Sequence, residues 1–225
     1  MEHEIGWLIK TAIEYGVPLN TVMLILFLPI VVTVITFFRQ IVGIKAFGIY
    51  TPAMITFAFL IIGMQSGSLL NGVKYGVTMF VMVIAVGTLS RVFMKRFRLL
   101  YLPRMAIVIT MVAFITLGVL MISGYYHRTG LANVSIFPIL IMITLVEKFV
   151  STQIEKGSRI AIILSVETLA ISLIAYFIIG LPSLGLFVQK YPLAVLLTVI
   201  VNVFLGRWSG LRVTEYFRFN NLISK

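Results

Sequence analysis

Apolar runs of the length that crosses a lipid bilayer recur through the whole chain, separated by short polar or charged stretches. They occupy about residues 19–38, 46–64, 74–93, 105–123, 134–150, 159–180 and 191–206. A helix needs about 20 apolar residues to cross the hydrocarbon core. Inside lipid the backbone must satisfy its own hydrogen bonds, which restricts such runs to helices. The sequence therefore predicts an all-α polytopic membrane protein with seven transmembrane helices.

Composition excludes most other classes. Of the 225 residues, 60% are hydrophobic and 11% are charged, which no soluble fold accommodates. The chain has no Cys, and its two His residues, His3 and His127, lie outside the apolar runs, so we expect no metal site and no cofactor. A P-loop, HExxH and GxSxG are absent as well. We therefore expect no enzyme activity from this chain on its own.

The distribution of positive charge predicts the orientation. Of the 18 Lys and Arg residues, all but Lys10, Lys74, Arg128 and Lys190 fall in the first, third and fifth loops and in the tail. Cytoplasmic loops carry the excess of Lys and Arg. This rule places the N-terminus outside and the C-terminus in the cytoplasm of a bacterial inner membrane. It also explains the net charge of +11 without nucleic acid.

Three regions follow from this assignment. Residues 1–18 are predicted to form an amphipathic segment in the membrane interface, because the apolar residues recur on one face. That face holds Ile5, Leu8, Ile9, Ala12 and Ile13. Residues 19–208 form the seven-helix membrane domain, and residues 209–225 form a basic cytoplasmic tail. We expect residues 151–158, which are mostly polar, to form a loop.

The second and fifth spans are short, and each carries a proline near its start, Pro52 in GIYTPAMI and Pro138 in VSIFPILI. By the predicted orientation these two spans enter the membrane from opposite sides. Spans 1–3 and 4–6 would then be inverted repeats, with the seventh span added. Interrupted spans at matching positions of two such halves indicate a transport site near the bilayer midplane. The alternative is that proline is simply common in the first turn of a helix.

Two polar residues lie inside spans. Glu167 is the one acid clearly within a span, where a carboxylate is costly unless it is paired or neutral. It is either a site for a proton, cation or amine, or half of an ion pair with an arginine such as Arg159 or Arg104. Asn202 in the seventh span is a further candidate for the pathway, but an interhelical hydrogen bond is the favoured interpretation.

A set of cations marks the predicted cytoplasmic face: Arg39, Lys45, Lys95, Arg96, Arg98 and Arg104. They are candidates for binding anionic lipid, a phosphate- or carboxylate-bearing substrate, or an acidic cytoplasmic partner. The orientation signal alone accounts for part of this cluster.

Four segments carry a family resemblance: GIKAFGIYTPAMITFAF, YLPRMAI, FPILIMITLVEKF and GRWSGLRVTEYFRF. Together they resemble the bacterial seven-helix membrane domain that is usually fused to an inactive transglutaminase-like domain. The resemblance covers about Leu19 to Phe219. GIYTP and SIFPILI are also similar to proline-containing segments of the small multi-span subunit of poly-γ-glutamate capsule synthases.

The resemblance implies a partner role, because both families are linked to cytoplasmic amide ligases, of the ATP-grasp type in the first. We therefore expect a membrane component of a peptide or poly-amino-acid (glutamate-type) synthesis or export system. Its partners would be membrane lipids, the ligase and an extracytoplasmic transglutaminase-like domain, which this sequence lacks and which would attach at the outside N-terminus. A homo-oligomer is compatible with the short spans. Two alternatives stay open: a stand-alone secondary transporter coupled through Glu167, and a scaffold or signalling module that transports nothing.

Overall fold

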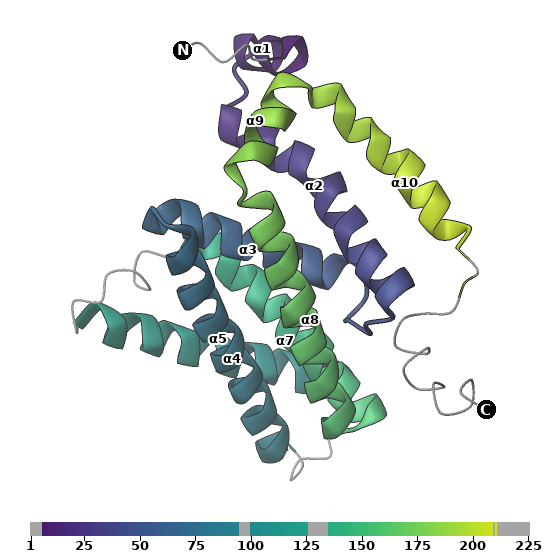
Figure 1. The fold of residues 1–225 in the computed structure, drawn as a ribbon. Coiled ribbons are helices and arrows are strands. Elements are labelled where there is room, and N and C mark those ends of the chain that lie inside the picture. Colours follow the sequence, from purple (N-terminus) through teal and green to yellow (C-terminus); the bar gives the residue numbers. More distant parts are fainter. Residues whose placement is uncertain (1–5, 95–99, 126–134, 209, 211–225) are drawn as a thin grey trace. The chain divides into compact units, whose positions relative to one another are not determined.

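The computed structural model describes residues 6–94, 100–125, 135–208 and 210, and these are helical almost throughout (Figure 1). The α-helices are α1 (Trp7–Glu14), α2 (Leu19–Phe37), α3 (Tyr50–Ser66), α4 (Leu69–Met94), α5 (Tyr101–Tyr125), α7 (Ile136–Lys156), α8 (Ser158–Ile179), α9 (Pro182–Lys190) and α10 (Leu197–Gly206). A π-helical turn, η1 (Phe38–Val42), extends α2, and a 3₁₀ turn, η2 (Pro192–Leu196), precedes α10. No strand occurs in these residues.

The helices confirm the positions of five of the seven predicted spans. Five are long and apolar enough to cross a membrane: α2 with its η1 extension, α4, α5, α7 and α8. Helices α9 and α10 would make a sixth span if taken together, although the chain bends by 104° between them. Helix α3 is shorter, with 17 residues. Two predictions were wrong: that the fifth span is short, and that residues 151–158 form a loop. Helix α7 has 21 residues and ends only at Lys156.

The chain divides into two compact units. Unit 1 comprises Met1–Thr56 and Ala170–Lys225, and unit 2 comprises Phe57–Leu169. The boundaries fall inside α3 and α8, so each unit takes segments from both halves of the predicted repeat. The inverted repeat stays a prediction, because compact units and repeat halves do not coincide.

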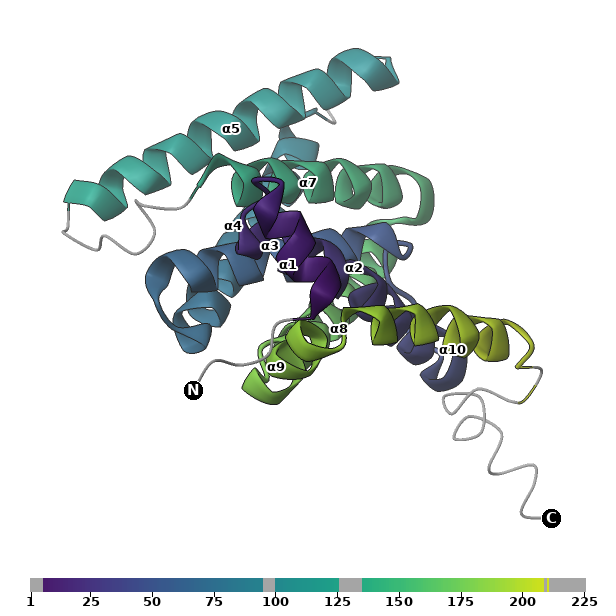
Figure 2. The ribbon, with the colours of Figure 1, turned by 90° about the horizontal axis from the view of Figure 1, so that it is seen from above.

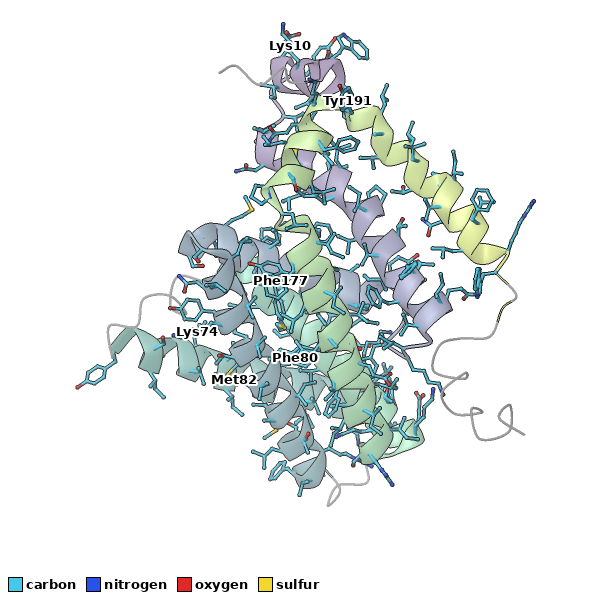
Figure 3. All side chains as sticks on the ribbon, in the orientation of Figure 1. Lys10, Lys74, Phe80, Met82, Phe177 and Tyr191 are labelled. Atoms are coloured by element: carbon cyan, nitrogen blue, oxygen red, sulfur yellow. The ribbon has the colours of Figure 1, made fainter. Side chains whose placement is uncertain are left out.

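Unit 1 contains α1, α2, α9 and α10, with the parts of α3 and α8 that belong to it. Helix α1 is fixed where it begins: the Gly6 N–H donates to the Gln189 carbonyl over 2.8 Å. A Cβ at Gly6 would lie 2.9 Å from Cγ of Pro192, so the backbone approaches this ring closely. Tyr191, labelled in Figure 3, marks the bend that separates α9 from η2 and α10. The predicted interfacial role of residues 1–18 is not tested by these contacts, and Ile5 lies outside the described residues.

Helix α4 is central to unit 2, where it packs against α5 and α7 and contacts α3. Helices α3 and α4 form a hairpin that turns at Gly67, whose φ of 70° suits glycine. The two helices pack so tightly that a Cβ on Gly76 would lie 2.6 Å from Cε1 of the Phe59 ring. On another side of α4, Gly87 faces α7, and a Cβ there would lie 3.3 Å from both Phe149 and Val146. The glycines let α4 approach both helices closely.

Helices α4 and α7 run in the same direction. Before they start, the Ser135 N–H donates to Oε1 of Gln65 over 3.1 Å. After they end, the Arg91 guanidinium donates to the hydroxyl of Ser158. Both helices accordingly descend through unit 2 in Figure 1. A parallel pair is what the charge count requires of these two spans; which end faces the cytoplasm stays a prediction.

Candidate functional site

The two prolines predicted to interrupt spans instead begin them. Pro52 is the third residue of α3 and Pro138 the third residue of α7. A proline in the first turn leaves the hydrogen-bond ladder intact, because the N–H it lacks would have no helical acceptor. Both prolines are buried. Their matching positions fit the predicted repeat, and they fit equally the ordinary preference of proline for helix starts.

Pro52 is part of a buried polar contact in unit 1. Its carbonyl oxygen accepts a hydrogen bond from Oγ1 of Thr56 over 2.8 Å and one from Oγ of Ser172 over 3.0 Å. Thr56 Oγ1 also lies 3.2 Å from the Ser172 carbonyl oxygen. Thr56 and Ser172 are fully buried. These groups join the start of α3 to α8 and satisfy one another.

Asn202 makes the interhelical hydrogen bond that the sequence suggested. Its Nδ2 donates to Oγ1 of Thr33 on α2 over 2.8 Å and to the Thr198 carbonyl on its own helix over 2.9 Å. Thr33 in turn donates to the Pro29 carbonyl over 2.7 Å. Asn202 therefore links α10 to α2, in unit 1.

Glu167 lies on α8 in the part of the helix that belongs to unit 2. Its side chain is half-buried and interacts with another group of the protein. Two buried hydroxyl residues flank it on the helix, Ser165 and Thr168. Each donates to its own helix backbone, Ser165 to Ala161 over 2.8 Å and Thr168 to Leu164 over 2.6 Å. The hydrogen bonds of both hydroxyl groups therefore lie within α8.

The predicted cationic cluster is spread over several elements. Arg39 is half-buried in η1, and Lys45 is exposed in the segment between η1 and α3; both belong to unit 1. Arg104 is half-buried in the first turn of α5, in unit 2. Lys95, Arg96 and Arg98 lie outside the described residues, as does the predicted tail at residues 209–225 apart from Gly210.

The sequence analysis missed two polar residues of unit 2, Ser90 on α4 and Gln153 on α7. Both are buried. Neither the Ser90 hydroxyl nor the side-chain amide of Gln153 has a hydrogen-bond partner among the described residues. The signal that reveals Gln153 is the spacing of three or four residues at which it continues the buried face of α7. Interpreting residues 151–158 as a loop concealed that spacing.

No group of His, Cys, Asp or Glu side chains that could hold a metal ion occurs in the described part of the chain. The polar groups that the structure does gather are hydroxyls, amides and guanidinium groups. Such side chains bind ligands through hydrogen bonds and, in the case of guanidinium groups, through positive charge.

Comparison with known protein families gives a match over nearly the whole chain. Residues 13–223 match the family described as seven transmembrane helices usually fused to an inactive transglutaminase. No curated protein and no solved structure gave a significant match. The match covers nearly the whole chain and agrees with the helices, which make this a multi-span membrane protein. The chain belongs to the family of seven-helix membrane domains usually fused to an inactive transglutaminase.

Proposed function

We propose that this chain is the inner-membrane component of a system that makes or exports a peptide or poly-amino acid of the glutamate type. In this proposal a cytoplasmic amide ligase of the ATP-grasp type docks on the basic face, and the chain performs no catalysis itself. The observation that carries the proposal is the family match over residues 13–223. Relatives that are usually fused to an inactive transglutaminase combine a membrane domain with a domain whose active forms handle peptides.

Two further features support a peptide-related role. The predicted cytoplasmic loops hold a dense group of cations at Lys95, Arg96 and Arg98, which suits an acidic partner surface. The membrane helices of unit 2 also carry two buried polar side chains without a hydrogen-bond partner among the described residues, Ser90 and Gln153. Buried polar groups of this kind are costly within a membrane, which favours a binding role for them.

Purification of the tagged protein from native membranes in mild detergent tests the proposal. We expect an amide ligase to co-purify in stoichiometric amount. Reversing the charge at Lys95, Arg96 and Arg98 should remove the ligase while leaving the amount of membrane protein unchanged. The matched control reverses Lys10, Lys74 and Lys190, which are predicted to lie on the opposite side; this variant should retain the ligase.

A different result would favour one of the other functions. Purification without any partner, repeated after gentle crosslinking, would contradict the ligase partnership. Uptake of a small solute by proteoliposomes that contain the chain alone, with a dependence on pH, would identify a secondary transporter. Loss of a partner that is no ligase after the same charge reversal would identify a scaffold or signalling module.

A further inference from the structure

The buried faces of α4 and α7 both end in a polar side chain. On each helix the buried residues recur every three or four positions, as on one face of a helix. They are Met79, Val83, Val86 and Ser90 on α4, and Met142, Val146, Phe149 and Gln153 on α7. Ser90 is 1% exposed and Gln153 is 0% exposed. At this end of the two helices the buried residues change from apolar to polar, and the polar side chains remain shielded from solvent.

Ser90 and Gln153 lie at the same level. Gly87 of α4 faces Val146, Phe149 and Val150 of α7. Because the two helices are parallel, one further turn along each brings the chain from Gly87 to Ser90 and from Phe149 or Val150 to Gln153. Three residues of helix advance by about 4.5 Å along the helix axis. Ser90 and Gln153 therefore lie at nearly the same distance beyond the contact at Gly87.

These side chains present three unsatisfied polar atoms. Oγ of Ser90 and both Nε2 and Oε1 of Gln153 are buried without a hydrogen-bond partner among the described residues. Buried polar groups in folded proteins are hydrogen-bonded in the great majority of cases. A partly satisfied buried network is less stable than an apolar core of the same shape. The three atoms are therefore candidates for hydrogen bonds to a ligand.

A guanidinium group lies at the same end of unit 2. Helix α5 runs antiparallel to α7, so its first turn, which contains Arg104, is at the end where α7 finishes (Figure 2). Nε of Arg104 is also buried without a partner in the described part of the chain. Next to Ser90, Arg91 is half-buried and donates to Ser158. Three helices thus contribute polar groups close to one positively charged end.

We propose that Ser90, Gln153 and Arg104 bind the carboxylate end of an amino acid or peptide, a choice of ligand that rests on the proposed function. The hydroxyl, the amide N–H and the guanidinium Nε–H donate to the carboxylate oxygens. Oε1 of Gln153 accepts from the N–H group next to that carboxylate. A lipid phosphodiester offers a similar oxyanion but lacks the amide N–H beside it. Charge-assisted hydrogen bonds of this type are the strong ones in a medium of low dielectric constant.

Entry to this cluster is from the ends of the helices. The residues that follow Gln153, Ile154 and Glu155, are exposed, and so is Ser158 at the start of α8. The buried amide therefore lies within one turn of the exposed end of α7. By the predicted orientation this end faces the cytoplasm, where a ligase would release its product.

Thermal unfolding of the purified full chain in detergent tests the site. We expect N-acetylglycine, which carries a carboxylate next to an amide N–H, to raise Tm by about 3–6 °C at ten times its Kd. Its methyl ester, which lacks the carboxylate, should have no effect. Short-chain phosphatidylglycerol is the lipid comparison. Stabilisation by this lipid and not by N-acetylglycine would overturn the assignment to a carboxylate, as would no response to either.

Substitutions of Gln153 and Ser90 test whether the ligand binds at this site. Gln153→Met should abolish the shift with N-acetylglycine and raise Tm of the ligand-free protein, because a buried amide without partners is replaced by an apolar chain of similar length. Ser90→Ala should weaken the rise in Tm caused by N-acetylglycine. If Gln153→Met does not fold, the response of Ser90→Ala decides whether the ligand binds at this site. Thr144→Val is the control, since Thr144 is exposed on α7 and donates only to the Leu140 carbonyl. It should keep the full shift.

A Gln153→Met protein that retains the full shift would overturn the site. So would a Gln153→Met protein with lowered Tm and an unchanged response in Ser90→Ala, because the polar pair would then serve only to hold α4 against α7. The assay contains no ligase. Failure to find a ligase in native membranes would contradict the proposed function and leave this binding result unaffected.

Discussion

Oγ of Ser172 donates a hydrogen bond to the carbonyl oxygen of Pro52, 3.0 Å away, and so joins α8 to the first turn of α3. The same carbonyl accepts from Thr56, four residues further along α3. All three residues are buried. Because the polar atoms satisfy one another, this contact has a sufficient structural role, and the proline needs no transport function to explain its place.

Removing these hydroxyls should lower the stability of the protein. Ser172→Ala deletes one of two hydrogen bonds to the Pro52 carbonyl, and we expect a loss of about 1 kcal/mol in the free energy of unfolding. Thr56→Val should cost at least as much, since Thr56 Oγ1 contacts two carbonyl oxygens. Denaturation in detergent measures both. Thr110→Val is the control, because Thr110 is exposed and donates only within α5; equal losses in all three would contradict this account.

Gly76 should tolerate a side chain less well than Gly87 or Gly118, which also lie in helices of unit 2. A Cβ there would lie 2.6 Å from Cε1 and 2.9 Å from Cγ of the fully buried Phe59. We expect Gly76→Ala to lower the free energy of unfolding by about 1–3 kcal/mol, the usual cost of overpacking a core. Gly118→Ala on α5 is the control, because nothing lies within 4 Å of its Cβ position. It should be neutral or slightly stabilising.

A double variant separates the clash from other effects of alanine. Phe59→Leu frees space beside Gly76, so adding Gly76→Ala to Phe59→Leu should cost much less than adding it to the wild type. The difference between the two costs is the coupling energy of the pair. Equal costs in both backgrounds would show that the Phe59 ring does not limit what position 76 can hold.

Much of the fold could be predicted, because lipid imposes a helix on every apolar run that is long enough to cross it. The sequence placed the end of the sixth span before Pro182, and α8 ends at Ile179. It failed at residues 151–158, where Ser151, Thr152 and Glu155 have the composition of a loop. The helix nevertheless continues to Lys156, and Gly157 follows with a φ of 91°.

The polar contacts could be predicted only in kind. An interhelical hydrogen bond by Asn202 was expected, but its partner Thr33 lies 169 positions away in the sequence and is fixed by how α10 packs on α2. Gln153 is the opposite case. Its residue type suggested nothing, and its importance appears only because α4 covers the face of α7 on which it lies.

Glu167→Gln tests whether the carboxyl group takes part in transport. If Glu167 lines the route for the product, the substitution should abolish export while the amount of protein in the membrane stays normal. Amide and carboxyl groups have the same shape, so packing on α8 is preserved. Export and protein level are measured in the same cells. Unchanged export would remove Glu167 from the mechanism and leave it as a structural residue.

The parallel arrangement of α4 and α7 can be tested by crosslinking, for which a chain without Cys is well suited. A short thiol-specific crosslinker should join Gln65→Cys to Ser135→Cys, and Arg91→Cys to Ser158→Cys, because each pair is in contact. The mismatched pair Gln65→Cys with Ser158→Cys should not react, since the 26 residues of α4 separate the two ends by about 39 Å. Reaction of the mismatched pair would contradict the parallel packing.

The Ser158→Cys variant also reports the orientation of the chain in the membrane. A membrane-impermeant maleimide should label it in inside-out vesicles and not in intact cells, because this end of unit 2 is predicted to face the cytoplasm. The reverse result would place this end of unit 2 outside.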